Sequence, residues 1–215
     1  MKIAIAGGHG KVALIMTRLL KDRGEQPRSL IRDASQAEDV IRAGGEPVVT
    51  DLEQSTDEEL DEALIDCEAI VFAAGAGPGS GPERKETVDY GGAVRLIESA
   101  QRRGIERYVM LSSVGADAEK QGDEAFDVYL RAKGRADRKL AESGLDFTVV
   151  RPVSLTDHLG TGLISTGGDS MQPEVPREDV AETLAEVLER DDLVGVTFTF
   201  GSGPDMIGEA LDRLA

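Results

Sequence analysis

Short apolar runs alternate along this chain with stretches in which apolar residues recur every three or four positions. The short runs predict strands over residues 3–6, 28–31, 47–49, 69–75, 108–111, 146–152, 163–166 and 195–200. The periodic stretches predict helices over residues 12–20, 34–43, 57–64, 83–103, 126–143, 177–190 and 205–214. Because strands and helices alternate, the pattern predicts an α/β fold built on one doubly wound, parallel sheet.

The length of the chain, 215 residues, suits one domain with a single core. We therefore predict a single domain over residues 1–215. Residues 153–176 contain four glycines and are predicted to be irregular apart from the short strand at 163–166. We expect this segment to form a small lid that binds the substrate.

The charge of the chain excludes several kinds of partner. Its 24 Lys and Arg residues stand against 41 Asp and Glu, giving a formal net charge of −17. Such a surface repels nucleic acid and anionic membranes, so we expect neither as a partner. The chain has a single cysteine, Cys67, and no apolar run long enough to span a membrane, and we expect no signal peptide. We therefore predict a soluble, cytoplasmic protein. We expect it to be a monomer or a homodimer.

The first predicted strand runs directly into a glycine-rich turn and a helix. Gly7 allows a sharp turn, Gly10 allows backbone N–H groups at the helix N-terminus to approach a pyrophosphate, and Ala13 allows close packing. In this strand–turn–helix context, the spacing G-x-x-G-x-x-A indicates dinucleotide binding. The alternative is an ordinary tight turn between a strand and a helix.

The end of the second predicted strand indicates which dinucleotide binds. Many NAD-selective folds place a carboxylate there, against the ribose 2′-hydroxyl, whereas this chain has Arg32. A guanidinium suits the 2′-phosphate of NADP by charge and geometry, so we expect NADP (NADPH) rather than NAD. The neighbouring Asp33 weakens this preference, and a solvated arginine is the alternative. Asp51 and Leu52, after the third strand, either cover the adenine edge or form a simple turn.

A second group of residues suggests acid–base chemistry. Tyr129 and Lys133 stand four residues apart on a predicted helix and therefore share one face. A lysine cation near a tyrosine favours the phenolate form, which allows the tyrosine to act as a general acid or base. Ser113 or Ser112, at the end of the fifth strand, could orient a substrate carbonyl. Tyrosine and lysine at this spacing also occur by chance on helices.

Residues 75–82 are the most glycine-rich stretch of the chain and follow the fourth predicted strand. Open α/β sheets bind ligands at the carboxyl ends of their strands. We interpret this stretch as a mobile edge of the cofactor site, with an inert surface loop as the alternative.

Together these motifs resemble the short-chain dehydrogenase/reductase superfamily, and specifically its atypical, extended-like NAD(P)H-binding branch with a Rossmann-like fold. The resemblance spans essentially the whole chain. It implies that residues after the sixth strand, beginning with Pro152 and Val153, flank the nicotinamide. The residues expected to contact the cofactor are Gly7, Gly8, His9, Gly10, Lys11, Val12, Arg32, Asp51, Leu52, Ala73, Ala74, Gly75, Ser112, Lys133, Pro152 and Val153.

The catalytic residues implied by the resemblance are Ser113, Tyr129, Lys133 and Asp89. Asp89 departs from the family pattern, because active members usually carry asparagine on this helix. We expect an NADP(H)-dependent oxidoreductase that acts on a small carbonyl or quinone-like molecule, with no metal. The alternatives are a sugar-nucleotide-type epimerase or isomerase that uses the same hydride, and an NADP(H)-binding redox sensor without catalysis.

Overall fold

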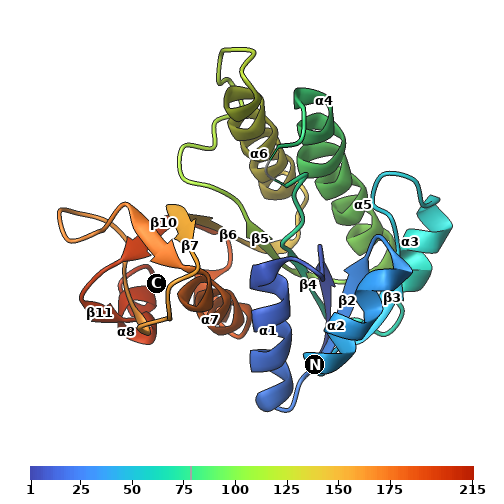
Figure 1. Cartoon of the computed structure of the whole chain (residues 1–215), viewed down its shortest axis with the longest axis horizontal. Helices are drawn as coiled ribbons and strands as arrows, with labels where there is room; N and C mark the ends of the chain where they lie inside the picture. Colours follow the sequence, from blue (N-terminus) through green and yellow to red (C-terminus); the bar gives the residue numbers. More distant parts are fainter. Residues whose placement is uncertain (78) are drawn as a thin grey trace.

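A central sheet of nine strands organises the computed structural model of the chain, which describes residues 1–77 and 79–215 (Figure 1). Seven neighbouring strands are parallel, in the order β10 (Val196–Ser202), β6 (Asp146–Pro152), β5 (Arg107–Leu111), β4 (Ala69–Phe72), β1 (Lys2–Ala6), β2 (Gln26–Ile31) and β3 (Glu46–Val49). Beyond β10, the short strands β8 (Leu163–Ser165) and β11 (Asp205–Met206) extend the sheet with antiparallel pairings. The predicted α/β fold with a doubly wound, mostly parallel sheet is confirmed.

Helices cover both faces of this sheet. The first face carries α1 (Lys11–Asp22), α7 (Arg177–Leu188) and α8 (Ile207–Asp212). The second carries α3 (Asp57–Ala63), α5 (Ala93–Arg103) and α6 (Ala125–Ala141). The remaining helical segments are η1 (Ala34–Gln36), α2 (Ala37–Arg42), α4 (Pro82–Arg84), η2 (Lys85–Gly92) and η3 (Asp191–Leu193). No helix in residues 1–77 and 79–215 is long and apolar enough to cross a membrane.

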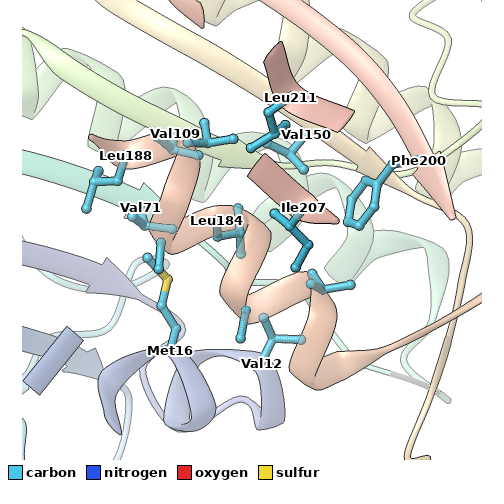
Figure 2. Close-up of a cluster of buried hydrophobic side chains, with 14 of the residues drawn as sticks. Val12, Met16, Val71, Val109, Val150, Leu184, Leu188, Phe200, Ile207 and Leu211 are labelled. Carbon is cyan, nitrogen blue, oxygen red and sulfur yellow. The ribbon is translucent and has the colours of Figure 1, made fainter. Parts of the chain in front are cut away.

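Alternate residues of each strand enter two separate hydrophobic clusters, because successive side chains point to opposite faces of a sheet. In β1, Ile3 and Ile5 face α1 and α7, whereas Ala4 and Ala6 face α3, α5 and α6. Figure 2 shows the first cluster, in which Met16 of α1 and Leu184 of α7 lie against strand residues such as Val71. The sheet is therefore buried on both sides, as its parallel strands require.

The structure differs from the sequence-based prediction at three places. The stretch 83–103 is helical, but its middle part, η2, is a π-helix rather than an α-helix. The segment 153–176 contains two further strands, β7 (Ser154–Thr156) and β9 (Glu174–Pro176), which pair with each other. The third place is Asp205–Met206, predicted as the start of a helix, which forms the strand β11 against β8 before α8 begins at Ile207. The predicted strand at 163–166 is present as β8, whereas β7, β9 and β11 were missed because two or three residues carry too little periodicity.

Packing between α1 and α7 should contribute strongly to stability, because these helices meet over the centre of the sheet. The Leu184→Ala substitution removes a fully buried side chain and should lower the free energy of unfolding by about 2–5 kcal/mol. In Ile41→Ala, the replaced side chain is 61% exposed, so the change should stay within about 0.5 kcal/mol. Urea denaturation of both variants measures this difference, and equal losses would contradict the assigned core.

Candidate functional site

Two adjoining cavities open at the carboxyl ends of the parallel strands. The first, of about 270 Å³, lies over the ends of β1 and β2, and the second, of about 710 Å³, lies over β5 and β6. Both are lined by Ala73, Ala74 and Gly75, which follow β4. Together the two cavities form a cleft that crosses the boundary between β1 and β4. At this boundary the order of the strands in the sheet reverses, and open α/β sheets bind their ligands at such a point.

The glycine turn forms one wall of the first cavity. Gly7 has a φ of +75°, and a Cβ there would lie 2.6 Å from the Cα of Ala74. A Cβ on Gly8 would lie 2.4 Å from the Cβ of Ser29. Gly10 is different: it is exposed, and an added Cβ would meet only the Gly7 carbonyl oxygen, at 3.1 Å. Packing thus requires glycine at 7 and 8, whereas glycine at 10 keeps open the space before α1.

The other predicted residues of this turn have separate contacts. The Nε2 atom of His9 lies 2.7 Å from a carboxylate oxygen of Asp39, and this hydrogen bond lowers the pKa of Asp39. Lys11 donates a hydrogen bond of 2.6 Å to Asp157, and Val12 is buried in the cluster between α1 and α7. His9 lines the first cavity, but Lys11 and Val12 are not among the residues that line either cavity.

Arg32, predicted to contact the cofactor, lines the far end of the first cavity and is exposed there. It makes no hydrogen bond or ion pair with another residue of the described chain. The neighbouring Asp33 instead caps η1: its carboxylate accepts a hydrogen bond of 2.8 Å from the backbone N–H of Ser35, which lowers its pKa. Arg28, at the opposite end of β2, binds Glu46 and lies away from the cavity.

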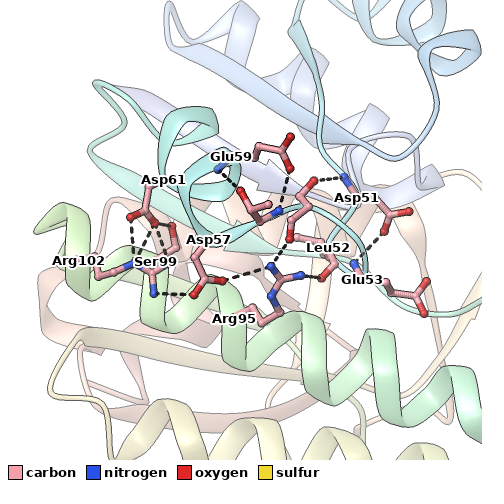
Figure 3. A network of polar contacts seen from close by, with 11 residues as sticks. Asp51, Leu52, Glu53, Asp57, Glu59, Asp61, Arg95, Ser99 and Arg102 are labelled. Carbon is pink, nitrogen blue, oxygen red and sulfur yellow. Dashed lines mark hydrogen bonds and ion pairs between the residues drawn. The ribbon is translucent and has the colours of Figure 1, made fainter.

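Asp51 and Leu52, in the loop after β3, line the same cavity. Figure 3 shows the polar contacts that surround this loop. Arg95 of α5 fixes this loop by donating hydrogen bonds to the carbonyl of Leu52, at 2.8 Å, and to that of Ser55. The carboxylate of Asp51 accepts a hydrogen bond of 2.8 Å from the N–H of Glu53. The loop is therefore held in one conformation where it faces the cavity.

Sequence reasoning missed two charged residues of the first cavity, Glu53 and Arg84. Glu53 accepts hydrogen bonds from Arg84, at 2.7 Å, and from Thr87, at 2.6 Å. Burial alone would raise the pKa of Glu53, but the hydrogen bonds from Thr87 and Arg84 outweigh it and lower that pKa. Neither residue lies at a strand end or in a recognisable motif.

Lys133 and Asp89 form the floor of the second cavity. The ammonium of Lys133, whose residue is 3% exposed, donates hydrogen bonds to the carbonyls of Leu111 (3.1 Å) and Ala74 (3.3 Å). It lies 3.7 Å from Oδ1 of the fully buried Asp89. The other carboxylate oxygen of Asp89 accepts a hydrogen bond of 3.1 Å from the N–H of Ala76. This buried ion pair therefore ties α6 to η2 and to the chain after β4.

Tyr129, Ser112 and Ser113 all line the second cavity. The hydroxyl groups of the two serines differ in burial and in their hydrogen bonds. Ser112 is buried and donates a hydrogen bond of 2.7 Å to Asp137, whose pKa burial raises against the opposing effect of Ser112 and Arg151. Ser113 is more accessible and donates only a long hydrogen bond of 3.2 Å, to the carbonyl of Val114. Ser113 therefore has the hydroxyl more easily redirected to a ligand.

The rest of the wall comes from several segments. Pro152 and Val153, predicted to flank the nicotinamide, line the second cavity together with Leu155 of β7. His158 lines a separate cavity of about 380 Å³. The glycine-rich loop 75–82 borders the cleft through its described residues, and Pro78 lies outside them. Sequence reasoning missed two further wall residues, Lys85 of η2 and Phe126 of α6, which stacks on Tyr129.

Comparison with known proteins identifies the family. A family model described as NAD(P)H-binding matches residues 7–191. The chain is 34% identical over 215 residues to the "Uncharacterized sugar epimerase YhfK" of Bacillus subtilis, with all of both chains covered.

Two solved structures extend this similarity to three dimensions. One is a "Putative NAD-dependent epimerase/dehydratase" of Bacillus halodurans, with a TM-score of 0.90, 34% identity and complete coverage of both chains. The other is the oxidoreductase ylbE of Lactococcus lactis, with a TM-score of 0.85, 29% identity, and coverage of 100% of this chain and 96% of that chain. The chain therefore belongs to the NAD(P)H-binding, oxidoreductase- and epimerase-like family of atypical short-chain dehydrogenases/reductases.

Proposed function

We propose that the protein is an NADP(H)-dependent oxidoreductase that acts on a small carbonyl or quinone-like compound. One observation carries this proposal: Tyr129, Lys133 and Ser113 line a cavity that adjoins the glycine-turn cavity along residues 73–75. A dinucleotide bound along the glycine turn could extend into the second cavity, where these side chains lie.

The residues of the first cavity fit such a cofactor. Gly10 keeps space open at the N-terminus of α1, whose first turn carries no acidic side chain to repel a pyrophosphate. Arg32 offers a guanidinium with no carboxylate partner among the described residues, whereas Asp33 is occupied as a helix cap. These contacts favour NADP over NAD, because only the 2′-phosphate can use the charge of Arg32.

When bound, the cofactor would supply or accept the hydride, and the protein would handle the proton. We assign the general acid and base role to the hydroxyl of Tyr129. Ser113 would donate a hydrogen bond to the substrate oxygen. Lys133 is held by Leu111, Ala74 and Asp89, so it would supply a fixed positive charge beneath the reacting groups. A carbonyl that gains one hydride and one proton becomes an alcohol.

A second candidate is an epimerase or isomerase, which removes and returns a hydride at one carbon of the same molecule. The names of the two Bacillus proteins favour it. A redox sensor would need the first cavity but not the chemistry of Tyr129. For all three candidates we propose a cytoplasmic location, with which the free, buried thiol of Cys67 agrees, and a monomer or homodimer.

The Gly10→Val substitution should abolish dinucleotide binding while the protein stays folded. The Cβ of a branched side chain would occupy the space before α1 and would meet only the Gly7 carbonyl oxygen within the protein. Calorimetric titration with NADPH measures the effect, and circular dichroism checks the fold. Unchanged affinity in a folded variant would remove the cofactor from this cavity.

Arg32→Ala should weaken NADPH binding far more than NADH binding. Losing a charge-assisted, bidentate contact to the 2′-phosphate should cost about 1.5–3 kcal/mol. Arg103→Ala removes the same charge from an exposed position at the end of α5 and serves as the matched control. Equal losses for both dinucleotides in Arg32→Ala would show that this arginine does not select NADP.

Tyr129→Phe separates an enzyme from a sensor. Turnover of aldehydes, ketones or quinones should fall by roughly 10²- to 10⁴-fold, the usual effect of removing a general acid or base. Affinity for NADPH should be retained, since the phenyl ring keeps the cavity wall intact. NADPH oxidation by the parent and the variant is the measurement. Undiminished turnover in Tyr129→Phe would exclude the proposed role of the tyrosine.

A further inference from the structure

Besides the buried pair at its floor, the second cavity presents one more charged side chain, Lys85 of η2. We propose that Lys85 binds a negatively charged group of the substrate, so that the substrate is a carbonyl compound with a carboxylate or phosphate on an apolar body. This inference rests on the proposed function of the second cavity and specifies its substrate class.

Two helices present charged and aromatic side chains to this cavity in matching pairs. On η2, Lys85 and Asp89 stand four residues apart, and on α6 so do Tyr129 and Lys133; all four line the cavity. Asp89 lies against Lys133, and the ammonium of Lys85 lies 5.3 Å from the centre of the Tyr129 ring. The ion pair of Lys133 and Asp89 is thus buried beneath an outer pair, formed by the Lys85 cation and the aromatic ring of Tyr129.

Lys85 differs from Arg84, Glu86 and Asp89 in lacking a partner of opposite charge. Arg84 pairs with Glu53 at 2.7 Å, Glu86 with Arg135 at 2.7 Å, and Asp89 with Lys133 at 3.7 Å. Among the described residues Lys85 forms no ion pair. Its ammonium group donates a hydrogen bond of 2.9 Å to the carbonyl of Gly77. An ammonium group has three N–H donors, so this contact leaves two for a ligand.

A half-buried ammonium without a counter-ion is a favourable site for an anion. The Gly77 carbonyl and the Tyr129 ring stabilise the charge of Lys85 but do not neutralise it. The net charge of the chain is −17, and this field repels an anionic substrate unless a local cation compensates. Since Asp89 balances Lys133, Lys85 is the uncompensated charge in the wall of the second cavity.

The remaining wall defines the rest of the substrate. Leu111, Phe126, Val153 and Leu155 are apolar and line the cavity together with Ala125 and Pro152. They suit a hydrocarbon or aromatic body rather than a sugar, whose hydroxyl groups need several polar partners. Because Lys85 lies over Tyr129, the anionic group of the substrate would sit beside the residue that transfers the proton.

Matched substrate pairs test this inference with the full-length protein. The first pair, 4-formylbenzoate and its methyl ester, tests recognition of a carboxylate. The second pair, 4-formylphenyl phosphate and 4-methoxybenzaldehyde, tests recognition of a phosphate. NADPH oxidation gives kcat/KM for each compound. The parent should prefer the anionic member of at least one pair. In Lys85→Met this preference should fall by roughly 10- to 100-fold, as expected for a lost contact between charged groups. Lys85→Arg should restore much of it.

The control is Lys21→Met, which removes the same charge from an exposed position on α1 and should keep the preference of the parent. Equal losses for charged and neutral members in Lys85→Met would overturn the inference, because Lys85 would then act on the loop or on Tyr129. A parent that prefers the neutral members of both pairs would also overturn it.

Calorimetric binding of benzoate and phenyl phosphate, against benzyl alcohol, separates this inference from the proposed function. If no aldehyde oxidises NADPH but the parent binds the anions more tightly and Lys85→Met does not, the oxidoreductase proposal fails and the anion site stands. If binding shows no preference that depends on Lys85, the inference is wrong regardless of turnover.

Discussion

The site depends on a contact between backbones that leaves no room for side chains. Gly7 approaches the chain at Ala74, and Gly8 approaches Ser29 of β2. These contacts hold the glycine turn between the ends of β1, β2 and β4, and they place the N-terminus of α1 over the same edge of the sheet. Because residues 73–75 serve both cavities, the same contact sets where the first cavity meets the second.

Buried polar groups then fix the second cavity. Lys133 joins the ends of β4 and β5 through two backbone carbonyls, and Asp89 brings η2 to the same point. On the neighbouring strands, Asp137 of α6 holds both Ser112 and Arg151. Breaking one such buried pair leaves an uncompensated charge, so these contacts strongly disfavour alternative arrangements of α6.

Much of this architecture could be predicted from the sequence, because its signals are local. Apolar periodicity located the strands and helices, and the glycine turn, Arg32, Ser113 and the Tyr129–Lys133 pair all lie along the cleft. Two further details of the structure also have local signals in the sequence. Val12 shares the apolar period of Met16 and therefore faces the core. Asp33 and Gln36 have the spacing of a capping box, which explains why that carboxylate is occupied at the start of η1.

Other features could not be predicted, because they arise from packing between distant segments. Lys85 and Phe126 reach the second cavity only through the way η2 and α6 lie together. The choice between Ser112 and Ser113 depends on Asp137, which is 25 positions away from Ser112 in the chain. The π-helical conformation of η2 has no signature in its composition.

That π-helix makes the helical geometry of η2, and not only its side chains, a determinant of the site. A π-helix takes more residues per turn than an α-helix, so a regular α-helix over the same eight residues, Lys85–Gly92, would rotate everything before it relative to α5. Lys85 would then leave the wall of the cavity even though no side chain had changed. Two chains with identical residues between Gly81 and Ala93 would therefore present different clefts if only one of them formed the π-helix.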